Sequence, residues 1–197
     1  MPTLLNVGAG SKHKEIPSHY TGWEHRRLDI DPGCGADIVC DARELRERVP
    51  PASCDAVYCS HNLEHYYPHD GERVLLGFVH VLKPDGFAEI RVPDIGEVLR
   101  AVASRGLDLE DELYASPAGP IRVLDVVYGW QEEIARSSKE FYAHKTGFTA
   151  KSMARALSQA GFATAFLVPP MAMYELRVFA FRQAPTEVQR RLLGIDS

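Results

Sequence analysis

Short apolar runs alternate along this chain with segments of helical periodicity. Each run is about five residues long and stops at a turn-forming residue, which is typical of buried strands. The pattern predicts strands at residues 3–7, 25–30, 36–40, 55–59, 87–92, 162–168 and 174–182. It predicts helices at residues 42–48, 70–82, 94–104 and 149–160.

The helices are marked by their apolar spacing and by their end signals. In the segment 70–82 one face collects the apolar residues Val74, Leu75, Phe78, Val79 and Leu82. Residues 83–86, with the sequence KPDG, end that helix. Asp94 and Thr149 are good N-cap residues for the two later helices, and Glu97 stands at the capping-box position after Asp94. The boundaries of these helices are therefore visible in the sequence.

Strand, turn and helix alternate through most of the chain. This alternation predicts a Rossmann-like α/β fold with a mostly parallel sheet of seven strands and helices on both faces. Residues 105–148 interrupt the alternation, and they read as a small cap or substrate insertion. We therefore expect one domain over residues 1–197, with that insertion at about 105–148.

Composition and charge narrow the class of protein. The chain has 197 residues, of which 45% are hydrophobic and 25% charged, as in ordinary globular proteins. A formal net charge of −5 disfavours a nucleic-acid partner, and no apolar run approaches the ~20 residues that cross a bilayer. The first residues, MPTLLNVGAG, lack the features of a signal peptide. The four cysteines form no CxxC pair, and we read them as reduced thiols of a cytoplasmic protein.

Polar or glycine residues follow four of the predicted strands. In an open α/β sheet, ligands bind beyond the carboxyl ends of the strands. Gly8 and Gly10 follow the first strand and let backbone N–H groups approach a ligand closely. Asp29 ends the second strand and can accept two hydrogen bonds from ribose hydroxyls, whereas Asp41 follows the third and can accept one from an adenine amino group. Residues 60–67, with the sequence SHNLEHYY, follow the fourth strand.

A dinucleotide site is one interpretation of the first two strand ends. Gly8-x-Gly10 with an acid 19 residues later is similar to the fingerprint of NAD-binding proteins. However, the third glycine of that fingerprint would fall at His13, and residues 11–22 show no apolar stripe of a helix. The sequence therefore disfavours NAD.

Six segments together resemble the class I S-adenosylmethionine (SAM) dependent methyltransferases, in particular the group similar to methyltransferase type 11. They are LLNVGAGSK, RLDIDP, ADIVCDAREL, CDAVYCSHNLEHYY, VLKPDGFAEIRVPD and FTAKSMARALSQAGF. They occur in the order typical of the family and cover residues 3–93 and 145–182. The resemblance implies that the last strand, 174–182, is inserted antiparallel. The chain departs from the family at Asn6, where many members have an acid, and in the missing helix after Gly10.

The resemblance also assigns residues to the cofactor. Gly8, Ala9 and Gly10 would line its methionine moiety and ribose, and Asp29 would hold the ribose hydroxyls. Ile30 would lie against the adenine ring. Asp29 alone also fits a simple role in the turn that follows it.

The third and fourth strand ends complete the implied site. Asp41 and the backbone of Ala42 would read the adenine edge, although Asp41 also fits the N-cap of the next helix. Ser60 and His61 would lie beside the sulfonium and its methyl group. The candidate catalytic residues are His61 and His65, either of which could act as a general base if the acceptor is a hydroxyl or an amine. His65 also fits a structural role, in a hydrogen bond that braces the loop.

The string HNLEH fits a second pattern, the H-x-x-E-H of some zinc hydrolases. His61 and His65 have the spacing of two zinc ligands on a helix, but His61 follows a strand by one residue and Pro68 limits any helix there. No motif marks a third ligand. A zinc hydrolase is therefore disfavoured, and no metal is expected.

The implied activity is transfer of a methyl group from SAM to a small-molecule or glycan acceptor. The alternative is a non-catalytic module that binds SAM or a nucleotide. His144 returns from the insertion toward the sheet and either reaches the cleft or stays in solvent. Tyr128, Trp130 and Gln131 either line an acceptor pocket or form the core of the insertion.

Overall fold

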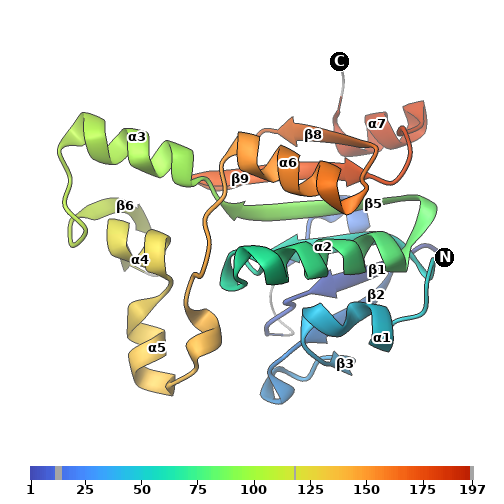
Figure 1. Ribbon diagram of the computed structural model, residues 1–197, viewed down its shortest axis with the longest axis horizontal. Helices are drawn as coiled ribbons and strands as arrows, with labels where there is room; N and C mark the ends of the chain where they lie inside the picture. The colour runs from blue at the N-terminus through green and yellow to red at the C-terminus, as the bar shows by residue number, and fades with distance from the viewer. Residues whose placement is uncertain (12–14, 118, 196–197) are drawn as a thin grey trace.

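A single seven-stranded sheet organises the chain (Figure 1). The computed structural model describes residues 1–11, 15–117 and 119–195. The strand order is β3-β2-β1-β4-β5-β9-β8. The strands of this sheet are β1 (Thr3–Val7), β2 (Glu24–Asp29), β3 (Ile38–Val39), β4 (Cys54–Ser60), β5 (Leu82–Pro93), β8 (Thr164–Val168) and β9 (Glu175–Phe181). β9 pairs antiparallel with both neighbours and the pairs among β1–β5 are parallel, which confirms the predicted topology and the antiparallel last strand.

Helices and short turns cover both faces of the sheet. The helices are α1 (Leu45–Arg48), α2 (Pro68–Val81), α3 (Ile95–Arg105), α4 (Val123–Tyr128), α5 (Gln131–Ser137), α6 (Ala150–Ala160) and α7 (Glu187–Leu193). The 3-10 turns are η1 (Ser18–Tyr20), η2 (Pro32–Cys34), η3 (Ala42–Glu44), η4 (Leu63–His65) and η5 (Glu140–Tyr142). α1, α2 and α6 cover one face, where Leu45, Phe78 and Leu157 join the main core (Figure 1). α7 and η1 cover the other face through Leu193 and Tyr20.

The predicted helix ends are confirmed at two caps. The Asp94 side chain accepts a hydrogen bond from the Glu97 backbone N–H at 3.1 Å, at the start of α3. At the start of α6, the Thr149 hydroxyl accepts one from the Ser152 N–H at 3.2 Å. β3 is shorter than predicted and β5 longer, because the segment 83–86 continues along β4 after a register shift rather than leaving the sheet.

Local patterns missed the short elements of the insertion and the last helix. The insertion contains a hairpin of β6 (Glu112–Ser116) and β7 (Gly119–Arg122), followed by α4 and α5. With α3, the hairpin and α4 form a separate apolar cluster around Val98, Leu113 and Val126. Each element is seven residues or shorter, too short for its periodicity to stand out. Among the described residues, no helix is both long and apolar enough to span a membrane.

A buried ion pair joins the two central strands β5 and β9. The Glu89 carboxylate is completely buried and lies 2.8 Å from Arg177 Nε and 2.9 Å from His19 Nε2. Burial raises the pKa of Glu89, but the contacts with His19 and Arg177 outweigh it and leave the pKa below its usual value. The carboxylate is therefore charged at neutral pH and depends on its two partners.

Removal of Arg177 should expose this dependence. Arg177→Ala leaves a buried, poorly compensated charge, and we expect the free energy of unfolding at pH 7 to fall by about 3 kcal/mol. Because the pKa of Glu89 is lower in the folded than in the unfolded protein, ionised Glu89 stabilises the wild type above its unfolded pKa. This stabilisation is lost as the pH falls through the folded pKa. The difference between variant and wild type should therefore shrink toward acid pH.

Urea denaturation from pH 7 to about pH 3, which extends below the usual pKa of a glutamate, measures this difference. Arg191→Ala, which removes an exposed arginine paired with Glu187 at 3.7 Å, is the control and should cost less than about 0.5 kcal/mol. A pH-independent loss for Arg177→Ala would show that lost packing, not the charge of Glu89, dominates.

Candidate functional site

The glycine turn after β1 is held by the end of β2. Gly8 and Gly10 adopt left-handed backbone angles, with φ of 69° and 60°. The Asp29 carboxylate accepts the Gly10 N–H at 2.8 Å and the Asp31 N–H at 2.9 Å. Asp29 therefore shapes the turn directly, a role that the sequence did not reveal.

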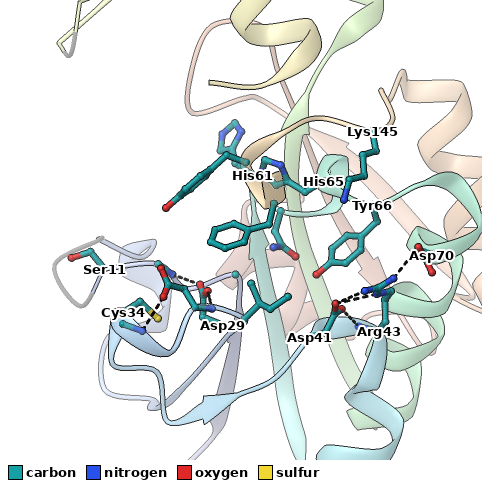
Figure 2. Close-up of a pocket in the computed structure, with 18 residues that line it drawn as sticks. Ser11, Asp29, Cys34, Asp41, Arg43, His61, His65, Tyr66, Asp70 and Lys145 are labelled. Atoms are coloured by element: carbon teal, nitrogen blue, oxygen red, sulfur yellow. Dashed lines mark hydrogen bonds and ion pairs between the residues drawn. The ribbon is translucent and has the colours of Figure 1, made fainter. Parts of the chain in front are cut away.

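A cavity of about 490 Å³ opens above these strand ends (Figure 2). Its volume lies in the range of small-molecule sites. Of the ten residues predicted for the site, seven line it: Gly8, Gly10, Asp29, Ile30, Asp41, His61 and His65. The other three, Ala9, Ala42 and Ser60, are buried and do not line it. Asn6 is buried as well.

Asp41 lies in the cavity wall but is already engaged. Its side chain accepts the Arg43 N–H at 2.9 Å, and its second oxygen pairs with the Arg43 guanidinium at 2.7 Å. Burial raises the pKa of Asp41, but the bonds from Arg43 outweigh it and lower the pKa. Arg43 also reaches Asp70 at 3.2 Å (Figure 2). The N-cap role is thus present, and an adenine amino group would share this carboxylate with Arg43.

Further cavity residues come from segments without a recognisable motif. Phe141, Tyr142 and Lys145 line the cavity from the last part of the insertion. Lys139 pairs with Asp31 at 2.6 Å and ties the insertion to the end of β2. No local sequence signal identifies these residues, because only tertiary folding brings them to the strand ends.

Asn62 packs directly against the glycine turn. A Cβ atom at Gly8 would lie 2.5 Å from Asn62 Nδ2, so any larger residue here would force Asn62 to move. Asn62 Oδ1 is buried and has no hydrogen-bond partner among the described residues, although Asn62 lines the cavity. An unpartnered buried acceptor in a cavity wall fits a ligand that donates hydrogen bonds.

His61 lies between two buried carboxylates. Its Nε2 is 3.3 Å from Glu175 Oε2, and its Nδ1 is 3.5 Å from Glu64 Oε1. Arg91 holds Glu175 in place at 2.6 Å. Burial lowers the pKa of His61, but the contacts with Glu175 and Glu64 outweigh it and raise the pKa to about 9. A histidine that is protonated at neutral pH is a poor general base, which leaves His65 as the better candidate of the two.

The loop after β4 is bonded to the last part of the insertion. The Glu64 carbonyl accepts the N–H groups of Lys145 at 2.8 Å and Thr146 at 3.2 Å. His65 Nδ1 lies 3.1 Å from the Ala143 carbonyl. The bracing role considered for His65 is therefore present, and it brings His144 next to the loop.

A second cavity of about 850 Å³ lies between the loop and the insertion. His61 lines both cavities, and His144 lines the second. Trp130 belongs to the second cavity, whereas Tyr128 and Gln131 do not. Burial lowers the pKa of His144, so its ring is neutral at neutral pH. The arrangement is suited to two ligands that meet near His61.

Comparisons with known proteins agree with this geometry. Residues 7–90 match the sequence profile of a family described as a methyltransferase domain. No curated protein matches the chain in sequence. A SAM-dependent methyltransferase from Archaeoglobus fulgidus is 13% identical, with a TM-score of 0.55 over 91% of this chain and 86% of that one.

Two further solved structures share the fold. The 1,6-didemethyltoxoflavin N1-methyltransferase of Burkholderia thailandensis, solved with its substrate and S-adenosylhomocysteine, is 20% identical, with a TM-score of 0.54 over 93% and 72% of the two chains. The mitomycin 7-O-methyltransferase MmcR is 14% identical, with a TM-score of 0.55 over 92% and 49%. The fold is that of the class I SAM-dependent methyltransferases, and the resemblance found in the sequence is confirmed.

The contact between Gly8 and Asn62 gives a direct test of the turn. Gly8→Ala adds a left-handed alanine and forces Asn62 to move, so it should lower the free energy of unfolding more than strain alone. Gly106→Ala, at the end of α3 with φ of 65° and open space around it, is the matched control. We expect about 1 kcal/mol for the control and about 1–3 kcal/mol more for Gly8→Ala, measured by urea denaturation. If both variants lose the same free energy of unfolding, Asn62 moves away from the added methyl group at no cost.

Proposed function

We propose that this chain is a SAM-dependent methyltransferase that methylates a small-molecule or glycan acceptor. The observation that carries the proposal is the pair of cavities that share His61, the first of them at the carboxyl ends of β1, β2 and β4. Two of the structures similar in fold are named as methyltransferases of small molecules, which supports this acceptor class.

The first cavity is suited to SAM. Asp29 would hold the ribose hydroxyls while it keeps the Gly10 N–H, since a carboxylate has about four acceptor sites. Ile30 would lie against the adenine, with Asp41 and the Ala42 backbone near its edge. The unpartnered Asn62 Oδ1 would accept a hydrogen bond from the amino group of the methionine moiety.

The second cavity would hold the acceptor. The insertion at about 105–148 supplies most of its walls, including Tyr114, Arg122 and Trp130. We propose that this insertion is the substrate-binding part of a single methyltransferase domain. The mixed apolar and charged lining is compatible with a polar small molecule or sugar, and the net charge of −5 disfavours nucleic acid.

Positioning of the two ligands accounts for most of the proposed catalysis. When bound, SAM supplies a methyl group on a sulfonium, which transfers by in-line displacement. Alignment of two reactants lowers a barrier by up to about 7–11 kcal/mol. His61 is held rigidly by Glu64 and Glu175 at the junction of the cavities, where it would orient the acceptor. His65 is the candidate base, because its Nδ1–H bonds to Ala143 and leaves Nε2 free to accept a proton.

The alternative is a module that binds SAM or a nucleotide without catalysis. Both functions predict cofactor binding, but only the enzyme consumes the cofactor when an acceptor is present. Transfer of labelled methyl from SAM to members of a panel of small molecules and sugars separates the two.

The cofactor itself is tested by calorimetry. We expect micromolar binding of SAM and S-adenosylhomocysteine and much weaker binding of NAD, since no third glycine or following α-helix accompanies Gly8 and Gly10 in the described part of the chain. Heat with NAD but none with the two sulfur cofactors would overturn the proposal.

Asp29→Ala tests the ribose role. Loss of a charged acceptor for the hydroxyls should weaken S-adenosylhomocysteine binding by at least about tenfold, which is ~1.4 kcal/mol. Asp31→Ala is the matched comparison, because Asp31 lines the same cavity but pairs with Lys139. We expect a change below about threefold for it, equivalent to less than ~0.7 kcal/mol. The opposite ranking in two folded variants would assign the ribose to Asp31.

A further inference from the structure

Three potential metal ligands meet at the wall between the two cavities. They are Glu64 and His65 from the loop after β4 and His144 from the end of the insertion. One ligand atom from each lies within 4.8 Å of the others. The His65 and His144 rings are 4.9 Å apart, and His144 Nε2 is 4.0 Å from Glu64 Oε1. His144 lies 79 positions after His65 in the chain, which explains why the sequence marked no third ligand.

Both histidines are held in the orientation that metal ligands adopt. His65 Nδ1 is 3.1 Å from the Ala143 carbonyl, and His144 Nδ1 is 2.9 Å from the Val126 carbonyl. A carbonyl only accepts, so each Nδ1 carries a proton, and the nitrogen of each ring that can offer a lone pair to a metal is Nε2. Metal-ligating histidines almost always donate their other N–H to a carbonyl or carboxylate in this way.

Glu64 provides an independent sign of a missing partner. Its side chain is 2% exposed, and neither carboxylate oxygen has a hydrogen-bond partner among the described residues. The nearest groups are His61 Nδ1 at 3.5 Å and His144 Nε2 at 4.0 Å. His61 faces Glu64 at 3.5 Å but also pairs with Glu175 at 3.3 Å, so it compensates the buried Glu64 carboxylate only in part, and a bound cation would complete that compensation.

We propose that Glu64, His65 and His144 form a binding site for a first-row divalent transition metal, with zinc as the ion of choice. Two imidazole nitrogens and one carboxylate oxygen suit zinc, whereas magnesium and calcium prefer sites made of oxygen alone. A tetrahedral ion with bonds of ~2.0–2.1 Å places its ligand atoms about 3.4 Å apart, so separations of up to 4.8 Å would have to shorten by at most about 1.4 Å.

The bound ion would join the loop after β4 to the end of the insertion. This role differs from that of a zinc hydrolase built on HNLEH, because His61 is not a ligand and pairs with Glu175 instead. Zinc on His65 Nε2 would also remove that atom as a proton acceptor. Metal binding is independent of the methyl-transfer proposal, since it needs neither cofactor nor acceptor.

Calorimetry of the protein, stripped of metal with a chelator and then freed of the chelator, tests the site. We expect one zinc ion per chain with a dissociation constant of about 1 μM or tighter, a free energy near −8 kcal/mol, and no binding of magnesium at the same concentrations. Glu64→Gln and His144→Asn should each weaken zinc by at least about 100-fold, beyond the ~10–100-fold typical of lost outer-shell partners. Zinc should raise the Tm of the wild type and leave that of both variants unchanged.

His69→Ala is the control for adventitious binding, because His69 is exposed and lies outside the cluster. It should bind zinc like the wild type. Circular dichroism without metal verifies folding of each variant, and His144→Asn serves alone if Glu64→Gln does not fold. A wild type that takes up no zinc would overturn the site, as would zinc binding that survives both substitutions or is lost with His69.

Discussion

The parallel register of β1 with β2 and β4 is the constraint on which the candidate site depends. Val7 lies opposite Leu28 on one side and Cys59 on the other, so the next residues, Gly8, Asp29 and Ser60, lie at one level at this edge of the sheet. Parallel strands all end at the same edge, which is why residues far apart in sequence form one cavity there. Because Asp29 lies at the same level as the glycine turn, its carboxylate can accept the Gly10 N–H. A shift of one residue in this register would turn the buried side chains of β1 to the opposite face of the sheet.

The insertion becomes part of the site through a few specific bonds. Lys139 pairs with Asp31 at the end of β2, and the Glu64 carbonyl accepts the N–H groups of Lys145 and Thr146. These contacts hold the segment around His144 against the loop after β4. The separate apolar cluster of α3 and the insertion means that this part has a packing of its own. Polar contacts therefore contribute to its position relative to the sheet, together with Phe148 in the main core, and polar contacts respond to ligands and ions more readily than a shared core does.

Charge distribution separates the roles of three neighbouring histidines. His61 lies between Glu64 and Glu175, which raise its pKa to about 9, whereas burial lowers the pKa of His144. His65 and His144 donate their Nδ1 protons to carbonyl groups. The cationic imidazole is thus suited to orienting a polar acceptor, and the other two present Nε2 for a proton or a metal ion. The loop after β4 supplies His61 and His65, and the end of the insertion supplies His144.

The sequence by itself determined the sheet, its main helices and the cofactor side of the candidate site. Strand ends, glycine pairs and caps are local signals, so Gly8, Gly10, Asp29 and Asp41 could be placed before the structure was known. The sequence also marked the HNLEH segment as a candidate site, but it did not determine the role of each residue in that segment. Only the tertiary structure decided that Asp41 is shared with Arg43, that Asn62 packs on Gly8, and that His144 meets Glu64 and His65. The physical reason is that these contacts join segments whose separation along the chain carries no periodicity, and long-range packing alone fixes them.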